Sequence, residues 1–280
     1  MDISTVKIVS DSSADTLFLD AIPFACAPLK IITDECEYVD DQNLNVIDMV
    51  NYLAGYSGKS GTTCPSVGDW LTAFGDAEYV FCVTITSGLS GSYNSAVNAA
   101  QAYEEEHPGR KVCVIDSLSA GPEMRLTLEK LRTLILEGKE FDDICQEIVE
   151  YQQRTGLLFM LESLTNLANN GRVSKLAAKA VGVLGIRVIG KASDEGTLEQ
   201  LTKARGEKKA LPRLIELMQE LGHTGGKVRI AHCFNGITAK KLKETLEASF
   251  PSIDVEIYSA RGLVSFYAEK GGLLVGFEID

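Results

Sequence analysis

The clearest chemistry in this sequence belongs to a run of glycines and serines, SGLSGS at residues 87–92. The run follows an apolar strand pattern at residues 79–85 and opens a helical pattern at residues 92–106. Glycines permit a tight turn, and free N–H groups at a helix N-terminus attract an anion. The alternative is an ordinary strand-to-helix turn with a serine cap. G-x-G-x-x-G and a Walker A lysine are both missing, so dinucleotide and nucleoside triphosphate motifs are not supported.

Ser90 lies in this run and resembles the nucleophile of a G-x-S-x-G elbow, although the second glycine comes one position early. A serine nucleophile needs a base, and the three histidines are His107, His223 and His232. His232 ends a strand pattern and is the histidine that could face a cleft. Two alternatives therefore stay open. One is a serine-dependent hydrolase or acyltransferase that uses Ser90 and His232, and the other is a phosphate or phospho-metabolite binding module with a short polar pocket.

Two further polar motifs could contribute to such a site. The sequence TTCPS at residues 62–66 precedes a helix whose start has the spacing of a capping box, with Ser66 followed by Asp69. Arg172 follows Gly171, and its forked guanidinium suits an oxyanion. Alternatively, a helix ends at Gly171, and Arg172 is solvated or bonds to carbonyl groups.

The order of the strands and helices that position these residues changes near the middle of the chain. In the first part, strand patterns alternate with helical patterns, which is typical of an α/β layer structure with a mostly parallel sheet. The second part has a hairpin turn at residues 194–196, which favours an α+β domain with a mixed or antiparallel sheet. We therefore predict two packed domains, residues 1–157 and residues 158–280.

Two local predictions belong to the second part. A helix rich in small residues is expected at residues 177–185, and alternating runs on both sides of Gly271 and Gly272 predict a terminal hairpin.

Composition and charge exclude several classes of protein. Of the 280 residues, 45% are hydrophobic and 24% are charged, as in ordinary globular proteins. The formal net charge of −12 argues against nucleic acid as a partner. Residues 1–155 carry 25 acidic and 10 basic side chains, whereas residues 156–280 carry 14 and 17. The seven cysteines form no C-x-x-C pair, and neither a signal peptide nor a transmembrane segment is visible, so we expect a cytoplasmic protein.

Considered in order, the motifs resemble the DegV family of bacterial fatty-acid-binding proteins along almost the whole chain. The resemblance rests on SDSS at 10–13, TTCPS at 62–66, SGLSGSY at 87–93, DS at 116–117, GRVS at 171–174 and ARG at 204–206. It implies one long-chain fatty acid buried between two domains, with the C-terminal domain covering the acyl chain. It also implies a carrier that is not an enzyme and has no cofactor or metal. The family residues that hold the carboxylate match Thr62 and Ser90.

The resemblance also implies roles for neighbouring residues and for a partner. The implied ligand-binding residues besides Thr62 and Ser90 are Ser12, Thr63, Gly91, Arg172 and Tyr267. Some family members present their fatty acid to a fatty acid kinase, which makes the acyl phosphate, so a kinase partner and a transient membrane contact are expected. Two departures affect these expectations: Cys64 stands where glutamine is common, and Tyr267 stands where many members have a histidine.

Overall fold

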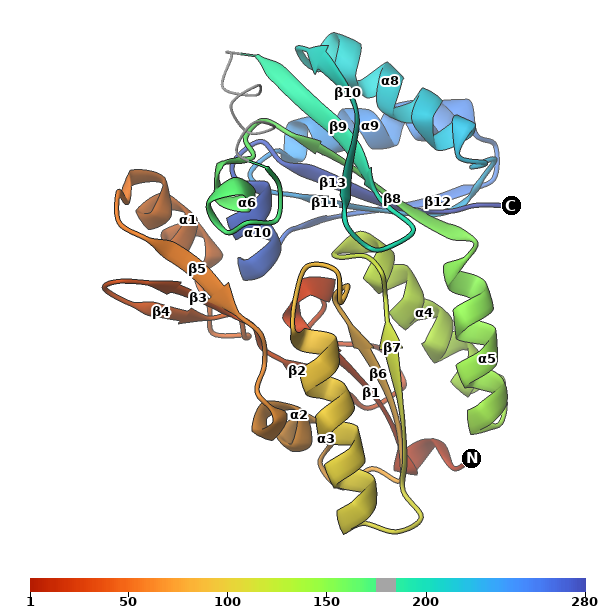
Figure 1. Ribbon diagram of the computed structural model, residues 1–280. Coiled ribbons are helices and arrows are strands. Elements are labelled where there is room, and N and C mark those ends of the chain that lie inside the picture. Colours follow the sequence, from red (N-terminus) through yellow and green to blue (C-terminus); the bar gives the residue numbers. More distant parts are fainter. Residues whose placement is uncertain (175–184) are drawn as a thin grey trace.

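The computed structural model describes residues 1–174 and 185–280 (Figure 1). The first sheet is parallel, as predicted, with strand order β2-β1-β6-β7. Its strands are β1 (Val6–Asp11), β2 (Phe24–Ala27), β6 (Tyr79–Thr84) and β7 (Lys111–Asp116). Helices α2 (Val67–Phe74) and α3 (Ser92–Glu106) pack on one face, and α4 (Pro122–Leu136) and α5 (Phe141–Gln152) pack on the other. The capping box of Ser66 and Asp69 starts α2 as expected.

A small antiparallel sheet extends sideways from this layer (Figure 1). It consists of β3 (Lys30–Thr33), β4 (Glu37–Val39) and β5 (Ser60–Thr63), and helix α1 (Val46–Gly55) lies between β4 and β5 in the chain. Two short 3-10 helices, η1 (Ile3–Thr5) and η2 (Ser12–Ala14), lie on either side of β1.

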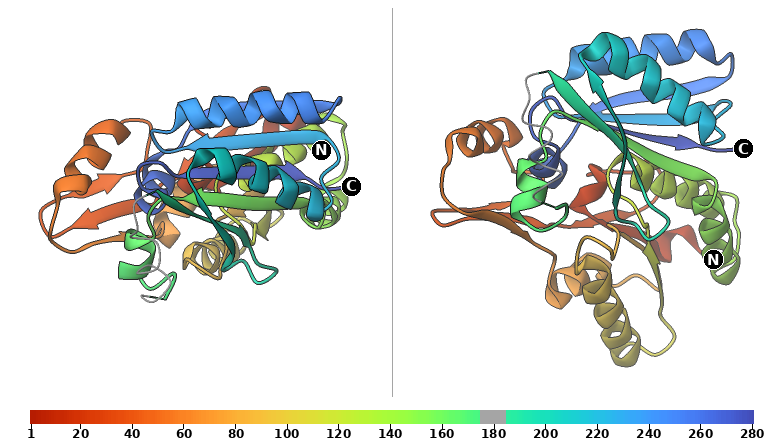
Figure 2. Two further views of the ribbon diagram at one scale, coloured as in Figure 1. Left: turned by 90° about the horizontal axis from the view of Figure 1, so that it is seen from above. Right: turned by 45° about the horizontal axis from the view of Figure 1, so that its top comes forward.

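The third sheet has six strands in the order β10-β9-β8-β13-β11-β12, and β11 and β12 form its parallel pair. These strands are β8 (Thr155–Leu161), β9 (Ile186–Ala192), β10 (Leu198–Arg205), β11 (Gly226–His232), β12 (Ile253–Ser259) and β13 (Leu273–Glu278). Helices α8 (Glu207–Glu220) and α9 (Gly236–Ser249) cover its outer face (Figure 2). The mixed sheet confirms the predicted fold class. The domain division at residues 157 and 158 stays a prediction, and it falls inside β8.

Helix α4 packs against strands of both large sheets. Its Glu129 carboxylate accepts hydrogen bonds from the Arg229 guanidinium of β11 at 2.7 Å through each oxygen. Gly276 of β13 lies under the start of α4, where a Cβ atom would come within 2.5 Å of the Glu123 backbone nitrogen. Glycine at this position therefore allows the helix to contact the third sheet directly.

The predicted terminal hairpin is wrong, because the first of its two runs forms helix α10 (Gly262–Ala268). Almost every side of α10 is buried, so its sequence is mostly apolar and shows no clear helical period. The carboxylate of Asp40 accepts hydrogen bonds from the N–H groups of Gly262 and Leu263 at 2.9 and 2.8 Å, which satisfies the helix start. Helix α6 (Thr165–Asn169) lies beside α10 (Figures 1 and 2). The small-residue helix expected at 177–185 lies outside the described residues, except for its last position.

Candidate ligand-binding site

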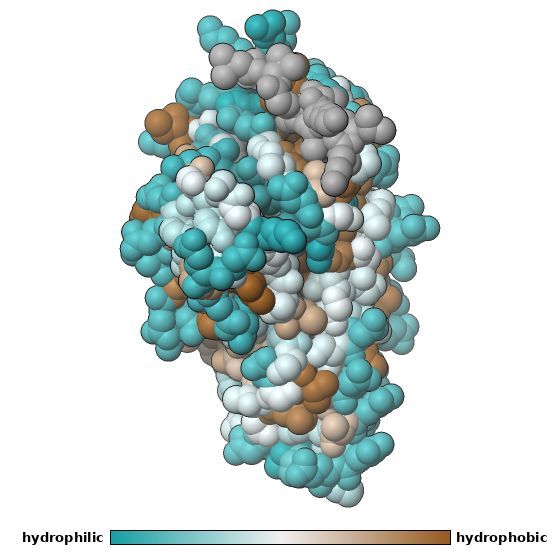
Figure 3. Space-filling view, turned by 60° about the vertical axis from the view of Figure 1, so that its left-hand side comes forward, coloured by the Kyte–Doolittle hydropathy of each residue, from teal (hydrophilic) through white to brown (hydrophobic). Residues whose placement is uncertain are grey.

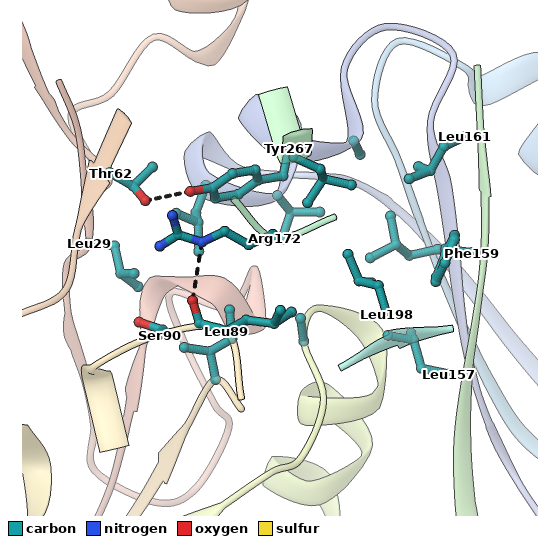
Figure 4. Close-up of a pocket in the computed structure, with 17 residues that line it drawn as sticks. Leu29, Thr62, Leu89, Ser90, Leu157, Phe159, Leu161, Arg172, Leu198 and Tyr267 are labelled. Atoms are coloured by element: carbon teal, nitrogen blue, oxygen red, sulfur yellow. Dashed lines mark hydrogen bonds between the residues drawn. The ribbon is translucent and has the colours of Figure 1, made fainter. Parts of the chain in front are cut away.

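A pocket lies between the carboxyl ends of the parallel strands and the inner face of the third sheet, where open α/β sheets commonly bind ligands. Seventeen residues line it (Figure 4). Four are polar: Thr62, Ser90, Arg172 and Tyr267. The apolar ones are Leu29, Ile85, Leu89, Ala120, Leu157, Phe159, Leu161, Leu167, Leu198, Leu263, Val264, Ala268 and Leu274.

The polar residues of the pocket gather at one end, where Leu29 and Leu89 accompany them. In Figure 4 the four polar side chains lie together, and Leu157, Phe159 and Leu161 lie on the opposite side. These three come from alternate positions of β8 and therefore share one face of the strand. The intervening Leu158 and Met160 belong to the core under α8 and α9. The pocket is therefore polar at one end and apolar along the rest of its length.

The polar end is assembled from four separate parts of the chain. Thr62 comes from β5, Ser90 from the loop before α3, Arg172 from the segment after α6, and Tyr267 from α10. The sequence motifs identified the first three segments, and the resemblance identified the fourth. The structure brings all four side chains to one place (Figure 4).

The hydroxyl groups at this end keep hydrogen-bonding capacity for a ligand. Thr62 Oγ1 and Tyr267 Oη are 2.7 Å apart, so one donates to the other and the second proton can be donated elsewhere. Ser90 Oγ accepts a hydrogen bond from the Ser92 N–H at 3.2 Å. Since the serine oxygen acts as an acceptor there, its own proton can be donated to a ligand oxygen.

Arg172 supplies the positive charge at the polar end. Its Nε donates to the Leu89 carbonyl at 3.3 Å, and Nη1 donates to the Asn170 carbonyl. The guanidinium carbon lies 5.8 Å from the centre of the Tyr267 ring. Gly171 adopts a positive φ of 74° just after α6, as expected for a helix end. Arg172 thus bonds to carbonyl groups, one of the alternatives considered, and it also lines the pocket.

The backbone of the glycine-serine loop is less free than the sequence suggested. The Ser87 N–H donates to the Asp116 carboxylate at 3.1 Å, and the N–H groups of Leu89 and Ser90 donate to the Thr86 carbonyl. Polar groups within and beside the loop thus satisfy these three N–H groups, which precede the helix. The hydroxyl groups of Thr62, Ser90 and Tyr267 are among the donors that line the pocket.

A buried carboxylate anchors the base of the loop. Asp11 accepts hydrogen bonds from the Ile85 N–H at 2.8 Å and from the Ser92 hydroxyl at 2.6 Å. Burial raises the pKa of Asp11, and these bonds, with those from Ser13, offset the effect only in part. No local pattern predicts this role of Asp11, which is the last residue of β1 and part of the SDSS motif.

The β9–β10 hairpin, whose turn was predicted at 194–196, packs directly on the same loop. A Cβ atom on Gly88 would lie 2.8 Å from the Glu195 carbonyl, and one on Gly196 would overlap the Thr86 hydroxyl. Leu198 of this hairpin lines the pocket. Glycines at 88 and 196 therefore allow the two halves of the protein to meet closely beside the pocket.

Comparison with known proteins agrees with this arrangement. The model of the family described as "Uncharacterised protein, DegV family" matches residues 5–279. The chain belongs to the DegV family. A DegV domain-containing protein of Streptococcus pneumoniae is 44% identical over 280 residues, which cover 99% of this DegV chain and 100% of the relative.

Solved structures of DegV proteins share the fold and contain fatty acids. A DegV family protein from Eubacterium eligens, loaded with heptadecanoic acid, has a TM-score of 0.97 and 47% identity, covering 98% of this chain and 100% of the other. The Streptococcus pneumoniae Fatty Acid Kinase (Fak) B3 protein, loaded with linoleic acid, has a TM-score of 0.96 and 43% identity, covering 98% and 99%.

Three of the predicted ligand-binding residues lie outside the pocket lining of this DegV protein. Thr63 and Gly91 are exposed to solvent. Ser12 is buried, and its hydroxyl accepts a hydrogen bond from the Leu29 N–H at 3.1 Å, so it supports a residue of the pocket wall. Contact of these three residues with a ligand stays a prediction. Cys64 Sγ lies 3.4 Å from the position of a Cβ atom on Gly91, beside the loop.

The two alternative functions receive no support from the pocket. His232 does not line it, and the Nδ1 atom of this histidine accepts a hydrogen bond from the Asn235 N–H at 3.4 Å. Burial lowers the pKa of His232. A phosphate module would need a short polar pocket, whereas thirteen apolar residues line this one.

Two absences concern the described part of the chain, one of a metal-binding cluster and one of a membrane-spanning helix. Within residues 1–174 and 185–280, no group of three or more His, Cys, Asp or Glu side chains is arranged to hold a metal ion. In the same ranges, no helix combines the length and apolar character that a membrane crossing requires.

Proposed function

We propose that this DegV protein binds one long-chain fatty acid between its two halves. The observation that carries the proposal is the asymmetry of the pocket, whose four polar residues gather at one end while thirteen apolar residues form the rest of the lining. A molecule with one charged group and a long apolar chain matches this distribution. The loaded structures of two proteins with more than 40% identity support the proposal. On the face shown in Figure 3 hydrophilic residues are widespread and hydrophobic ones form small separate groups.

The carboxylate would bind at the polar end. Thr62 and Ser90 would donate hydrogen bonds to its oxygens, and Tyr267 would orient the Thr62 hydroxyl through their 2.7 Å contact. The charge of Arg172 favours an anion there, which matters because the half that carries Ser90 has an excess of acidic side chains. The polar groups thus decide the direction in which the ligand lies in the pocket.

The acyl chain would supply most of the affinity. Burying about fifteen methylene groups at ~0.8 kcal/mol each gives a gross stabilisation of about 12 kcal/mol. Association and ordering cost ~4–15 kcal/mol, so a large share of that gain is lost. A hydrogen bond to a charged group adds about 1.5–3 kcal/mol. The acyl chain therefore sets the strength of binding, and the polar end sets its direction.

We propose further that the protein is a carrier rather than an enzyme, works in the cytoplasm and needs no cofactor. It would present the carboxylate to a fatty acid kinase that makes the acyl phosphate, and transient contact with a membrane would load or unload the acid. The similarity to the Fatty Acid Kinase (Fak) B3 protein supports the kinase partner.

Denaturing the purified protein and analysing the lipid extract by mass spectrometry tests the binding proposal. We expect about one fatty acid per chain, and an extract without a stoichiometric fatty acid would contradict it. A second arm adds a fatty acid kinase and ATP to the loaded protein and measures acyl phosphate. Failure of this arm alone would remove the kinase partner and leave binding in place. Covalent labelling of Ser90 by a serine-reactive phosphonate would instead favour the hydrolase.

A further inference from the structure

A second cavity lies directly behind the apolar end of the pocket. Its lining includes Glu123, Gln152, Thr155 and Lys191. Leu157 is the single residue, within the described part of the chain, that lines both the pocket and this second cavity. In Figure 4 Leu157 lies on the side opposite Thr62 and Ser90. The boundary between the two spaces therefore passes through this side chain.

The alternation of β8 explains how one residue separates the two spaces. Leu161, Phe159 and Leu157 share a face of the strand and line the pocket. Thr155 is the next residue on that face and lines the second cavity. On this face of β8, the residue before Leu157 in the strand lines the second cavity and those after it line the pocket, and Leu157 itself lines both.

The backbone around Leu157 is held by its neighbours. Leu157 is 5% exposed, and its cross-strand partner in β13 is Gly276. The start of α4 packs on Gly276, which brings Glu123 beside the same part of the sheet. Because helix and sheet are in direct contact there, the opening between the two spaces depends on the size of the side chain at position 157.

The second cavity is chemically unlike the pocket. The Thr155 hydroxyl donates to the Glu123 carboxyl at 2.7 Å, and burial raises the pKa of Glu123 even though hydrogen bonds from Ser119 and Thr155 oppose this. A methylene group gains free energy where it leaves water for an apolar surface. Beyond Leu157 it would meet a mixed lining, in which Leu118, Val149, Ala192, Leu221 and Ile279 stand beside the polar side chains, so that gain becomes smaller there.

We propose that Leu157 closes the acyl pocket at its far end and thereby sets the longest chain that this protein binds well. The proposal rests on the proposed fatty-acid binding. A chain that ends before Leu157 buries all its methylene groups in the apolar pocket, whereas a longer chain must displace the leucine and enter the second cavity, whose lining is mixed. Removal of the side chain joins the two spaces and relaxes the limit on length.

Competition among saturated acids tests this proposal. The unaltered protein, Leu157→Ala and Leu161→Ala are each stripped of lipid and offered an equimolar mixture of straight-chain acids from tetradecanoic to docosanoic. The bound acids are then quantified by mass spectrometry. We expect Leu157→Ala to raise the ratio of bound docosanoic to octadecanoic acid by about tenfold, since roughly two more buried methylene groups correspond to that factor.

Leu161→Ala is the matched control, because it removes the same atoms from the same strand and pocket without reaching the second cavity. It should weaken binding of every acid while leaving the ratio nearly constant. Equal shifts in both variants would show that added volume alone matters and would overturn the proposal, as would an unchanged ratio in Leu157→Ala.

A third variant covers the case in which Leu157→Ala does not fold. Leu157→Phe opens no cavity and should shift the preference towards tetradecanoic acid, so an unchanged preference in this variant would also overturn the proposal. The unaltered protein reports separately on the proposed function, because only a failure of that function would leave it without any bound acid.

Discussion

At the scale of single residues, the two hydroxyl groups assigned to the carboxylate have separate supports. Thr62 is held by Tyr267 of α10, and Ser90 is held by the backbone of Ser92 within its own loop. Arg172 connects the two supports, because its Nε donates to the Leu89 carbonyl beside Ser90 and its guanidinium carbon lies 5.8 Å from the centre of the Tyr267 ring. Since both hydroxyls would also bind the same carboxylate, we expect their contributions to binding to be coupled rather than additive.

Replacement of both hydroxyls tests their role directly. In the double variant Ser90→Ala with Thr62→Val, we expect affinity for a fatty acid to fall by more than about tenfold, because each lost hydrogen bond to a charged group is worth about 1.5–3 kcal/mol. Affinity for the corresponding fatty alcohol should change much less. Isothermal titration of lipid-free protein measures both affinities. Thr245→Val is the control, since Thr245 is exposed on α9 and lies outside the pocket lining. Equal loss for acid and alcohol would place the carboxylate elsewhere.

The sequence predicts the two hydroxyls that we assign to the carboxylate, whereas the long-range contacts of the site and its apolar wall cannot be predicted from local patterns. Ser90 and Thr62 stand in recognisable local motifs. The contact between Thr62 and Tyr267 joins positions 205 residues apart, so no local pattern reports it. β8 is apolar at almost every position because both of its faces are covered, and alternation therefore cannot single out Leu157, Phe159 and Leu161 as pocket residues.

At the scale of elements, exposure to solvent separates helix α3, which the sequence predicts, from helix α10, which it does not. Helix α3 was predicted at residues 92–106 and occupies those residues, because one of its faces is apolar and the other is solvated. Helix α10 was predicted as part of a hairpin because it is buried on nearly all sides, and the carboxylate that caps it, Asp40, lies 222 residues away from Gly262. Of these two helices, the local pattern predicts the one that keeps a solvated face.

The β9–β10 hairpin offers a test at this scale. Gly196 has a φ of 70° and touches Thr86 of the ligand loop, whereas Gly138 has a φ of 75° with no neighbour within 4 Å. Both alanine variants should carry the cost of a left-handed conformation, about 1 kcal/mol. Gly196→Ala should lose about 1–3 kcal/mol more, since its Cβ overlaps Thr86. Urea unfolding measures the difference, and equal losses in the two variants would contradict the close contact.

At the scale of the whole molecule, α4 joins the two large sheets. Glu129 on this helix meets Arg229 of β11, whose side chain is 3% exposed, and Lys227 and Arg125 lie nearby. Burial alone would raise the pKa of Glu129, but the hydrogen bonds and charge of Arg229 outweigh it, so the pKa lies below the ordinary value of 4.5. A carboxyl group with a lower pKa in the folded state stabilises that state above its unfolded pKa, and the contribution is lost as the pH falls through the folded pKa.

Glu129→Gln should therefore lower the free energy of unfolding by about 3 kcal/mol near neutral pH, because it leaves a buried guanidinium without its main partner. The difference from the unaltered protein should shrink as the pH falls below 4.5, where the native carboxyl group also becomes neutral. Urea unfolding at a series of pH values measures this, with Glu105→Gln on the exposed face of α3 as the control. A difference that does not vary with pH would argue against the ion pair.

The position of α4 has a consequence for the kinetics of ligand exchange. Proteins that close around a ligand by a hinge need a connection in which few contacts cross from one lobe to the other. Here a fifteen-residue helix is packed against strands of both sheets and is tied to one of them through Arg229. Separation of the two sheets would expose that helix to solvent and break the ion pair. Such a change would disrupt the protein almost as much as unfolding does. A bound acid should therefore leave by local opening of the pocket wall, at a rate that responds to small changes in the wall and little to the overall stability of the protein.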